Sequence, residues 1–402
     1  MDTPSGEQPG LLFTAFEPSG DDHASAVIRE LRRRHPNVPI YAWGGPKMAL
    51  AGARIVQNTG DHAVIGMPGW SVIKKYRRIH RDIESWLAQH PEVRVHVPVD
   101  SPAANFPICR IAKRAGRKVV HLVAPQLWAW GPWRIFKLRK LTDLVLCVLP
   151  FEEAWFKKRR VPARFIGHPL FDEPLDFEAL DRQAHGLPAG EPRVALFPGS
   201  RAAELRRNFP VLLGSFRELR KLHPTMTGTV AATTEAVREQ LYEKANMLGG
   251  WPDGLDVRVS QSDTVTRWCQ IALAVSGTVT LQIAKQARPM IIIYKANKLM
   301  YQLLGQWLLT TEYLALPNLI AGREISRELI PYFKGNDRLI EAADALIRDG
   351  EAREAQRLAL LNICSKFEGK IASAEAAEAI EEMAELKGPE TRAARTPALT
   401  GG

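Results

Sequence analysis

The chain has 402 residues, of which 46% are hydrophobic and 24% charged, a balance typical of a globular protein with about two to three domains. Its longest apolar runs, such as residues 144–151, fall short of the ~18 residues that cross a membrane. The first ten residues lack the basic start and apolar core of a secretory signal. The four cysteines show neither metal-binding nor redox spacing, so we expect a reducing compartment and no metal site.

Positive charge is concentrated in the first part of the chain. Residues 1–168 hold 26 Lys and Arg against 14 Asp and Glu, whereas the remainder holds 28 against 30. Phosphorylated substrates and anionic lipid surfaces would both be attracted to such a region. A nucleic-acid partner is not expected, because no interleaved aromatic–basic repeat or known module is present.

In the first half, short apolar runs alternate with helical patterns. The runs are residues 11–16, 40–43, 93–99, 118–123, 144–149 and 164–166, and the first helix is expected over 22–34. This alternation predicts a domain over 11–167 with a largely parallel sheet covered on both faces. Its ligands should bind where the strands end.

A segment rich in proline and acidic residues, 168–192, breaks this rhythm and is expected to be a linker. A second alternating set follows over 193–349, with strands expected at 194–197, 227–232, 257–260, 271–275 and 290–294. Residues 350–386 are a run of helix formers, and 387–402 have the composition of a disordered tail. The chain is therefore predicted to form two α/β domains with terminal helices.

One stretch of the second domain, RVALFPGSRAAELRRNFP at 193–210, has the pattern of an anion site. A strand leads through the turn Gly199-Ser200 into a helix, whose free N–H groups and positive dipole end attract anions. Arg201 is expected in the first helical turn, where the dipole disfavours a cation. A diphosphate bound by its guanidinium would explain why an arginine occupies this position.

Two further loops of the second domain carry polar residues suited to the same ligand. Ser276, Gly277 and Thr278 follow an apolar strand and open a helix, so their amides could meet phosphate oxygens, and Gln282 could reach a ribose hydroxyl. Asn318 and Glu324 are polar positions in an otherwise apolar loop-to-helix stretch. A helix cap or a surface polar residue is the alternative for each.

In the first domain, two carboxylates end expected strands. Asp100 follows the run 93–99 and Glu17 follows the run 11–16. A carboxylate at the carboxyl end of a parallel strand is a candidate general base for an acceptor hydroxyl, with helix capping as the alternative.

Residues 63–81 combine apolar side chains with a following run of cations, a pattern suited to an anionic lipid interface. We expect the contacts with lipid to come from Met67, Trp70, Val72, Ile73, Lys74, Lys75, Arg77 and Arg78. The alternative is an ordinary amphipathic helix that packs on the sheet.

From about residue 11 to 333 the sequence resembles the lipid-A-disaccharide synthase family. The resemblance rests on the stretches EPSGD (17–21), VDSP (99–102), HLVAPQLWAW (121–130), LPFEEAWF (149–156), FIGHPL (165–170), LFPGSRAAEL (196–205), VSGTVTLQ (275–282) and LPNLIAGRE (316–324), in this order. It implies an inverting glycosyltransferase of the GT-B fold, in which two Rossmann-like domains with parallel sheets face a cleft and the C-terminal helix packs back toward the first domain.

The implied reaction transfers an acylated glucosamine from a UDP-linked donor to an acylated glucosamine 1-phosphate, giving a β-1,6 disaccharide and UDP. Asp100 would be the catalytic base, with Glu17 as the second candidate, and Arg201 would serve the UDP end. Ser19, His168, Asn318 and Glu324 would contact substrate. No cofactor is expected, and because the sequence has no Asp-x-Asp motif, no metal is expected either. The protein would lie on the inner face of the cytoplasmic membrane and could form a homodimer.

The sequence departs from the family pattern near these positions. Phe16 stands where the family has Gly, Ala103 where it has an acid, and Gln282 where it has Glu. Two alternatives therefore stay open: a UDP-sugar transferase of the same architecture with another lipid acceptor, and a catalytically inert paralogue that binds lipid or nucleotide.

Overall fold

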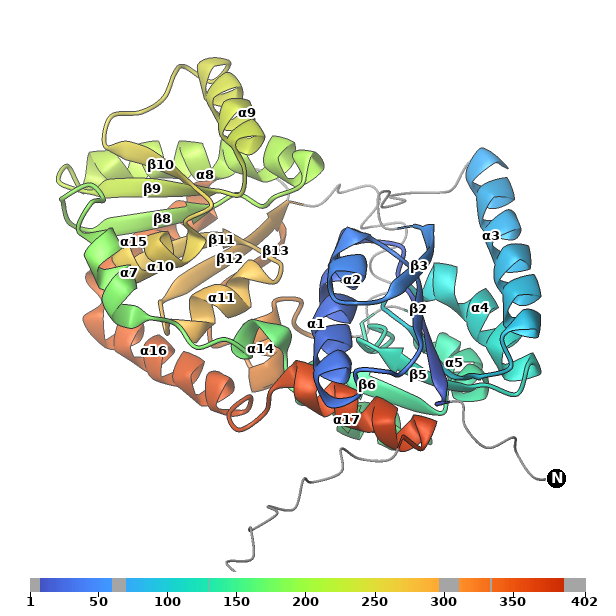
Figure 1. The fold of residues 1–402 in the computed structure, drawn as a ribbon. Helices are drawn as coiled ribbons and strands as arrows, with labels where there is room; N and C mark the ends of the chain where they lie inside the picture. Colours follow the sequence, from blue (N-terminus) through green and yellow to red (C-terminus); the bar gives the residue numbers. More distant parts are fainter. Residues whose placement is uncertain (1–7, 60–69, 130, 296–310, 333–334, 387–402) are drawn as a thin grey trace, which may run out of the picture. The chain divides into compact units, whose positions relative to one another are not determined.

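A computed structural model describes residues 8–59, 70–129, 131–295, 311–332 and 335–386. The chain divides into two compact units: residues 1–127, 132–172 and 370–402 form unit 1, and residues 128–131 and 173–369 form unit 2. The boundary between 172 and 173 lies within the segment expected to be the linker. Each unit is built on its own parallel sheet (Figure 1).

Unit 1 contains a seven-stranded sheet in the order β3-β2-β1-β4-β5-β6-β7. Its strands are β1 (Gly10–Thr14), β2 (Ile40–Gly44), β3 (Arg54–Asn58), β4 (Val93–Pro98), β5 (Lys118–Leu122), β6 (Leu144–Cys147) and β7 (Ala163–Phe165). Its helices are α1 (Pro18–Arg34), α2 (Pro46–Leu50), α3 (Trp70–Gln89), α4 (Pro102–Arg114), α5 (Ile135–Leu141), α6 (Glu152–Lys157) and α17 (Ala372–Ala384), with short 3₁₀ turns at Pro132–Arg134 and Pro169–Phe171.

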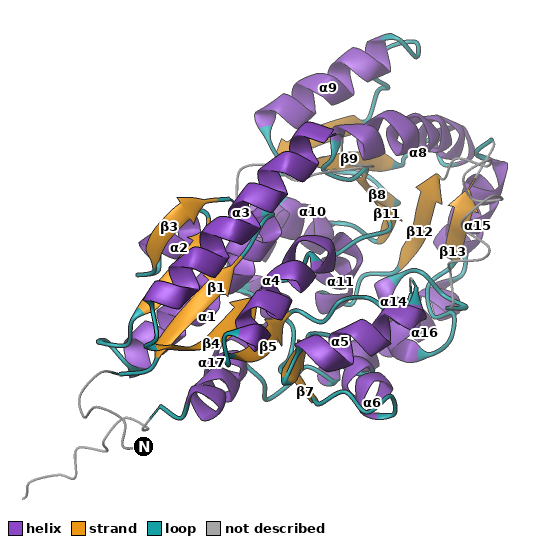
Figure 2. Ribbon diagram, turned by 90° about the vertical axis from the view of Figure 1, so that its right-hand side faces the viewer, coloured by secondary structure: helices purple, strands orange, loops and turns teal. Residues whose placement is uncertain are grey.

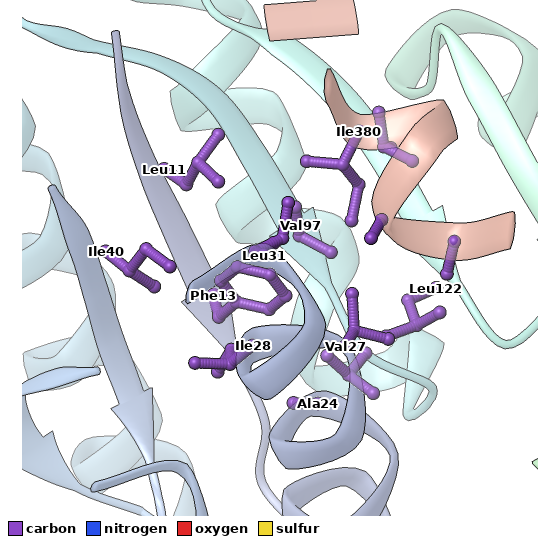
Figure 3. Close-up of a cluster of buried hydrophobic side chains, with 14 of the residues drawn as sticks. Leu11, Phe13, Ala24, Val27, Ile28, Leu31, Ile40, Val97, Leu122 and Ile380 are labelled. Atoms are coloured by element: carbon purple, nitrogen blue, oxygen red, sulfur yellow. The ribbon is translucent and has the colours of Figure 1, made fainter. Parts of the chain in front are cut away.

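The two faces of this sheet are covered by different helices. On one face, strand side chains such as Phe13 and Val97 pack against α1 and α17 (Figure 3), and Met48 of α2 belongs to the same buried cluster. On the other face, α3, α4 and α5 lie in one layer (Figure 2), and Ile83 and Leu138 of these helices are buried over the strands. The strands are nearly continuous apolar runs, so both faces of the sheet are buried, as the sequence predicted.

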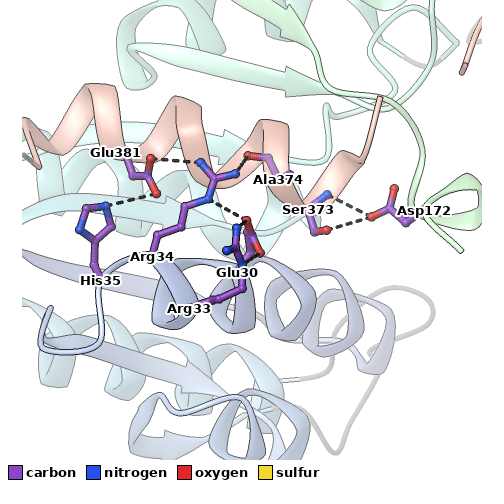
Figure 4. A network of polar contacts seen from close by, with 8 residues as sticks. All are labelled: Glu30, Arg33, Arg34, His35, Asp172, Ser373, Ala374 and Glu381. Carbon is purple, nitrogen blue, oxygen red and sulfur yellow. Dashed lines mark hydrogen bonds and ion pairs between the residues drawn. The ribbon is translucent and has the colours of Figure 1, made fainter. Parts of the chain in front are cut away.

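The C-terminal helix α17 belongs to unit 1 although it follows all of unit 2 in the chain. Ile380 is fully buried in the unit 1 core (Figure 3), and Arg34 of α1 bonds the carboxylate of Glu381 at 3.2 Å. Asp172 accepts hydrogen bonds from the backbone of Ala372 and from Ser373 at the start of α17 (Figure 4). The expected return of the C-terminal helix to the first domain is confirmed.

Unit 2 contains a six-stranded sheet in the order β10-β9-β8-β11-β12-β13. Its strands are β8 (Arg193–Phe197), β9 (Thr227–Ala232), β10 (Leu255–Val259), β11 (Ile271–Val275), β12 (Met290–Lys295) and β13 (Glu328–Tyr332). Its helices are α7 (Phe177–Ala184), α8 (Ala202–Leu222), α9 (Glu235–Asn246), α10 (Ser262–Trp268), α11 (Val279–Lys285), α14 (Leu316–Ala321), α15 (Asp337–Arg348) and α16 (Gly350–Ser365).

In each sheet the order in which successive strands are added reverses direction at one point. In unit 1 the point lies between β1 and β4, and in unit 2 between β8 and β11. The chain segments that follow the two strands at this point run to opposite sides of the sheet. Their divergence opens a crevice at the carboxyl ends of the strands. The loops after β1, β4, β8 and β11 are therefore the first places to look for a site.

Candidate functional site

In unit 1 the loops after β1 and β4 bring the predicted carboxylates to the same edge of the sheet. Glu17 follows β1 and accepts a hydrogen bond from the hydroxyl of Ser101, 2.7 Å away, in the loop after β4. Asp100 and Ser101 have φ angles of 47° and 39°, a left-handed backbone that is strained for residues other than glycine. The sequence placed Asp100 and Glu17 at strand ends, and the structure joins their two loops.

The electrostatics of this loop cluster favour a proton acceptor. Burial raises the pKa of Asp100 above its usual range, and the negative charge of Glu17 adds to this, whereas a hydrogen bond from the Ser101 backbone and the charge of His23 act the other way. His23 lies in the first turns of α1, and its own pKa is lowered by burial against the opposing effect of Asp100. Sequence reasoning missed His23, because a histidine within an amphipathic helix carries no motif.

His168 belongs to the same cluster. It follows β7, and its Nδ1 accepts a hydrogen bond from the backbone N–H of Leu170 at 3.1 Å. Burial, together with the charge of His23, lowers the pKa of His168 to about 4. His168 is therefore neutral near pH 7. Ser19, the other residue of unit 1 expected to contact substrate, is exposed on the first turn of α1.

A buried chain of hydrogen bonds holds the strained backbone at Asp100. The amide of Asn105 donates to the carbonyl oxygens of Val99 and Asp100, at 3.0 and 2.9 Å. Its oxygen accepts from the hydroxyl of Thr14 at 2.7 Å. Since that hydroxyl has only one proton, it accepts in turn from Nε2 of His96 at 2.9 Å. Thr14 and His96 thus determine which way the Asn105 amide faces.

The stretch EPSGD (17–21) also contains a structural carboxylate. Asp21 is buried and accepts hydrogen bonds from the backbone N–H groups of Gly45, Lys47 and Met48 at 3.0–3.1 Å. It therefore caps α2. Helix α1 begins at Pro18, and its N-cap residue Glu17 makes no side-chain capping bond.

In unit 2 the loops after β8 and β11 emerge side by side, because these two strands are paired in parallel. Gly199 has φ of 95°, and a Cβ there would lie 2.8 Å from Glu204 Oε2, so only glycine fits this turn. Ser200 is exposed in the same turn. Across from it, Ser276 is half-buried, and Gly277 and Thr278 are exposed with open space around Gly277.

Arg201 is placed differently from the prediction. It is the N-cap of α8 rather than a first-turn residue, and Glu204 occupies the first turn, where the dipole favours an acid. The guanidinium donates to Glu204 Oε1 at 3.0 Å, while the Arg201 side chain is 70% exposed. The dipole misfit inferred from the sequence is therefore wrong, but the guanidinium lies in an exposed pair that an anion can displace.

A cavity of about 820 Å³ opens at the carboxyl ends of β9 and β10 and reaches α11. Its lining includes Thr233, Ser260, Asp263 and Gln282. The amide nitrogen of Gln282 donates to Asp263 Oδ1 at 2.9 Å, which leaves the amide oxygen as an acceptor for a ligand hydroxyl. Sequence reasoning found Gln282 but missed Asp263 and Thr233, which no motif contains.

The structure does not bring Asn318 and Glu324 to these loops. Asn318 is fully buried, and its amide bonds Ser326 and Glu328 as donor and the N–H groups of Ile325 and Ser326 as acceptor. Glu324 accepts from the Glu328 N–H at 3.0 Å. Both residues lie before β13, next to Met290 at the amino end of β12, whereas Ser276 follows the carboxyl end of β11. These bonds hold the loop together, and the contact of Asn318 and Glu324 with substrate stays a prediction.

Two of the departures from the family pattern have a structural explanation. Phe16 is 3% exposed, and its ring lies 5.7 Å from that of Tyr76 in α3, so it fills space in the core. Gln282 is matched by Asp263, as described above. Ala103 is exposed on α4, and nothing in the structure explains the loss of the acid there.

The predicted lipid-binding segment is only partly described. Met67 lies outside the described residues, as do the side chains of Trp70, Val72 and Ile73. Lys74, Lys75, Arg77 and Arg78 are exposed on α3. Within the described ranges, no helix is long and apolar enough to cross a membrane. The tail 387–402 also lies outside the described residues.

Comparisons with known proteins agree with the sequence resemblance. The family model described as lipid-A-disaccharide synthetase matches residues 11–382. A lipid-A-disaccharide synthase from Solibacter usitatus is 34% identical over 94% of this chain and 98% of its own, and one from Pseudomonas putida is 35% identical over 85% and 90%.

Solved structures share the fold at low identity. The S. aureus MnaA–UDP co-structure has a TM-score of 0.60 at 11% identity, covering 94% of this chain and 98% of its own. Acinetobacter baumannii MurG has a TM-score of 0.54 at 11% identity, covering 94% and 99%. These similarities confirm the predicted GT-B fold.

Proposed function

Because the chain belongs to the lipid-A-disaccharide synthetase family and is thus a glycosyltransferase, we propose that it makes the β-1,6-linked lipid A disaccharide. The donor is UDP-2,3-diacylglucosamine and the acceptor 2,3-diacylglucosamine 1-phosphate. The observation that carries the proposal is the position of Asp100, whose pKa is raised. It directly follows β4, where the strand order of the unit 1 sheet reverses between β1 and β4.

Unit 2 supplies the groups for the donor. The loops with Gly199–Arg201 and Ser276–Thr278 face the diphosphate, and Arg201 exchanges Glu204 for phosphate oxygens. The cavity lined by Thr233 and Gln282 has room for the nucleoside, with the oxygen of Gln282 accepting from a ribose hydroxyl. The fold shared with a protein solved with UDP supports this assignment.

Unit 1 supplies the base. Asp100 takes the proton of the acceptor's 6-hydroxyl, and that oxygen attacks the anomeric carbon of the donor sugar. The bond between this carbon and the diphosphate breaks, UDP leaves with the electron pair, and the anomeric configuration is inverted. Glu17 holds Ser101 and, through its charge, favours the proton on Asp100.

The charge that develops on the leaving diphosphate is met by Arg201 and by the amides of the two unit 2 loops, so we propose that no metal is needed. Turnover should then be unchanged when EDTA is added to the protein. A loss of turnover that Mg²⁺ restores would contradict this part of the proposal.

The acyl chains of both substrates place the reaction at a membrane surface. We propose that the protein binds the inner face of the cytoplasmic membrane through residues 63–81, whose cations from Lys74 to Arg78 are exposed on α3.

One assay tests the function directly. The purified chain is incubated with both substrates, and the disaccharide is sought by mass spectrometry. Asp100→Asn keeps the size of the side chain and should lower kcat by about 10²- to 10⁴-fold. UDP binding without any turnover of the wild type would instead favour an inert paralogue, and release of UDP with another lipid acceptor would favour a different transferase.

The pH dependence tests the role of Asp100 separately. As the base, Asp100 acts when deprotonated, so kcat/KM should fall as pH decreases through its pKa. Since burial raises that pKa, the acidic limb should lie above the usual carboxyl range. A limb at the usual carboxyl value would contradict the assignment.

A further inference from the structure

Two aromatic side chains protrude from unit 1 at the start of α5. Trp133 is 60% exposed and Phe136 is 63% exposed, the highest values for any aromatic residue within the described ranges. Trp133 lies in the 3₁₀ turn Pro132–Arg134 that leads directly into α5, three residues before Phe136, so the two side chains are near neighbours. The opposite side of α5 is buried in the core through Ile135, Leu138 and Leu141. The aromatic pair is thus held outward by a well-packed helix.

The surface around the pair is cationic. Residues 101–142 contain nine Lys and Arg but no Asp or Glu. Exposed cations occur on all three helices of the layer formed by α3, α4 and α5 (Figure 2) and outnumber the exposed acids Asp82 and Glu84 of α3: Lys74, Lys75, Arg77, Arg78 and Arg81 on α3, Arg110 and Arg114 on α4, and Lys137, Arg139 and Lys140 on α5. The carboxylate that follows α5, Asp143, is paired with Lys113 at 2.8 Å.

We propose that Trp133 and Phe136 form a second membrane anchor, which inserts into the headgroup region of an anionic phospholipid bilayer. Tryptophan and phenylalanine are favoured at that depth, and the cations of α3, α4 and α5 meet lipid phosphates. The anchor is distinct from residues 63–73.

The shape and chemistry of this surface favour a bilayer over a macromolecular partner. Side chains that protrude into solvent need a matching pocket in a protein partner, whereas a lipid interface takes them up without one. The inference rests on the proposed function only in that both substrates carry acyl chains.

The test uses the full chain and vesicles without substrate. The protein is sedimented with phosphatidylcholine vesicles, with and without phosphatidylglycerol. We expect binding to the anionic vesicles that weakens with salt. The double variant W133S/F136S should bind at least about 10-fold more weakly, and K137Q/K140Q should lose about 5-fold per lysine and part of the salt dependence.

Leu50→Ser is the matched control. Leu50 is 89% exposed on α2, which packs with α1 on the other face of the same sheet, so its loss should leave vesicle binding unchanged. Circular dichroism and thermal unfolding establish that all variants are folded.

Unchanged vesicle binding by the W133S/F136S variant would overturn the proposal, as would an equal loss in L50S. Binding of the wild type to RNA but not to anionic vesicles would also overturn it. Turnover of water-soluble short-chain substrate analogues separates the two proposals: its absence in the wild type refutes the proposed function, while the vesicle result still decides the anchor.

Discussion

At the scale of single residues, the position of Asp100 depends on side chains that do not touch a substrate. The bonds from His96 through Thr14 to Asn105 hold the carbonyl groups of a strained turn. Thr14→Val removes the hydroxyl with little change in volume and leaves the buried oxygen of Asn105 without its donor. Asn105 then no longer holds the turn at Asp100 in place, and the catalytic carboxylate moves. We therefore expect kcat to fall by about 10- to 100-fold, with little change in the KM for the donor.

Thr14→Ser, which keeps the hydroxyl, is the control and should retain most of kcat. The pH profile of kcat/KM is a second measurement, and a general loss of stability would not change it. If Asp100 becomes more solvated in T14V, its pKa falls and the acidic limb shifts to lower pH. A T14V protein with wild-type kcat and pH profile would show that Thr14 serves only packing.

Arg201 provides a second test at this scale. Its guanidinium is exposed and pairs with Glu204 on the same turn, so its removal should affect ligand binding more than stability. Arg201→Ala should raise the Kd for UDP by about 10- to 100-fold, the value of hydrogen bonds to a charged ligand. Isothermal titration calorimetry measures this, with the exposed Arg207→Ala on the same helix as control. Equal affinities for UDP would remove Arg201 from the site.

At the scale of elements, Asp21 joins two helices of unit 1. Asp21→Ala leaves three buried or half-buried N–H groups at the start of α2 without their acceptor. We expect a loss of about 1–3 kcal/mol in the free energy of unfolding, measured with urea. Asp22→Ala is the control, because Asp22 is exposed and pairs only with Lys47 at the surface. Similar losses in both variants would argue against a specific cap.

The strands β4 and β5 carry two fully buried histidines whose titration should weaken the fold in acid. Burial lowers the pKa of His96 to about 3 and that of His121 to about 4. The unfolded chain takes up protons near pH 6.5 but the folded chain does not, so stability is present above that pH and falls as pH decreases toward 4. Each histidine contributes roughly 1.4 kcal/mol per pH unit.

His121→Leu should therefore flatten the pH dependence of the unfolding free energy by about half of this contribution. An unchanged slope in H121L would show that His121 is protonated in the folded state.

At the scale of the whole molecule, the C-terminal helix α17 is part of the hydrophobic core formed by the first strands and helices of the chain. Ile380 of α17 is fully buried among residues of β1, β4 and α1, although unit 2 separates them in sequence. Ile380→Ala should lower the unfolding free energy of unit 1 by about 2–5 kcal/mol. Leu361→Ala on α16, where the side chain is 42% exposed, should have little effect. Calorimetry should show the unit 1 transition moving to lower temperature while the unit 2 transition stays in place.

The interior strands and the family motifs were determined by the sequence alone. Buried parallel strands are apolar throughout, as in β8 and β11, so their runs stand out, and Asp100, Glu17, Gly199 and Gln282 fall directly after strands or within the motifs. The strands that were not predicted, β3 and β13, each lie at one edge of their sheet, whereas the opposite edge strands, β7 and β10, were predicted. β3 alternates between exposed and half-buried residues and β13 contains a proline, so neither has the apolar run of an interior strand.

Only the tertiary structure decided what each polar residue does. Asn318, Asp21 and Arg201 sit in motifs that look functional, yet Asn318 is bonded by backbone groups and Glu328, Asp21 by backbone N–H groups, and Arg201 caps α8. Conversely, His23, Thr14, Asp263 and Trp133 belong to no predicted site, and their roles follow from neighbours far away in the chain or from exposure. A sequence pattern reports which side chains are available, but hydrogen-bond partners and burial arise only when distant strands and helices meet.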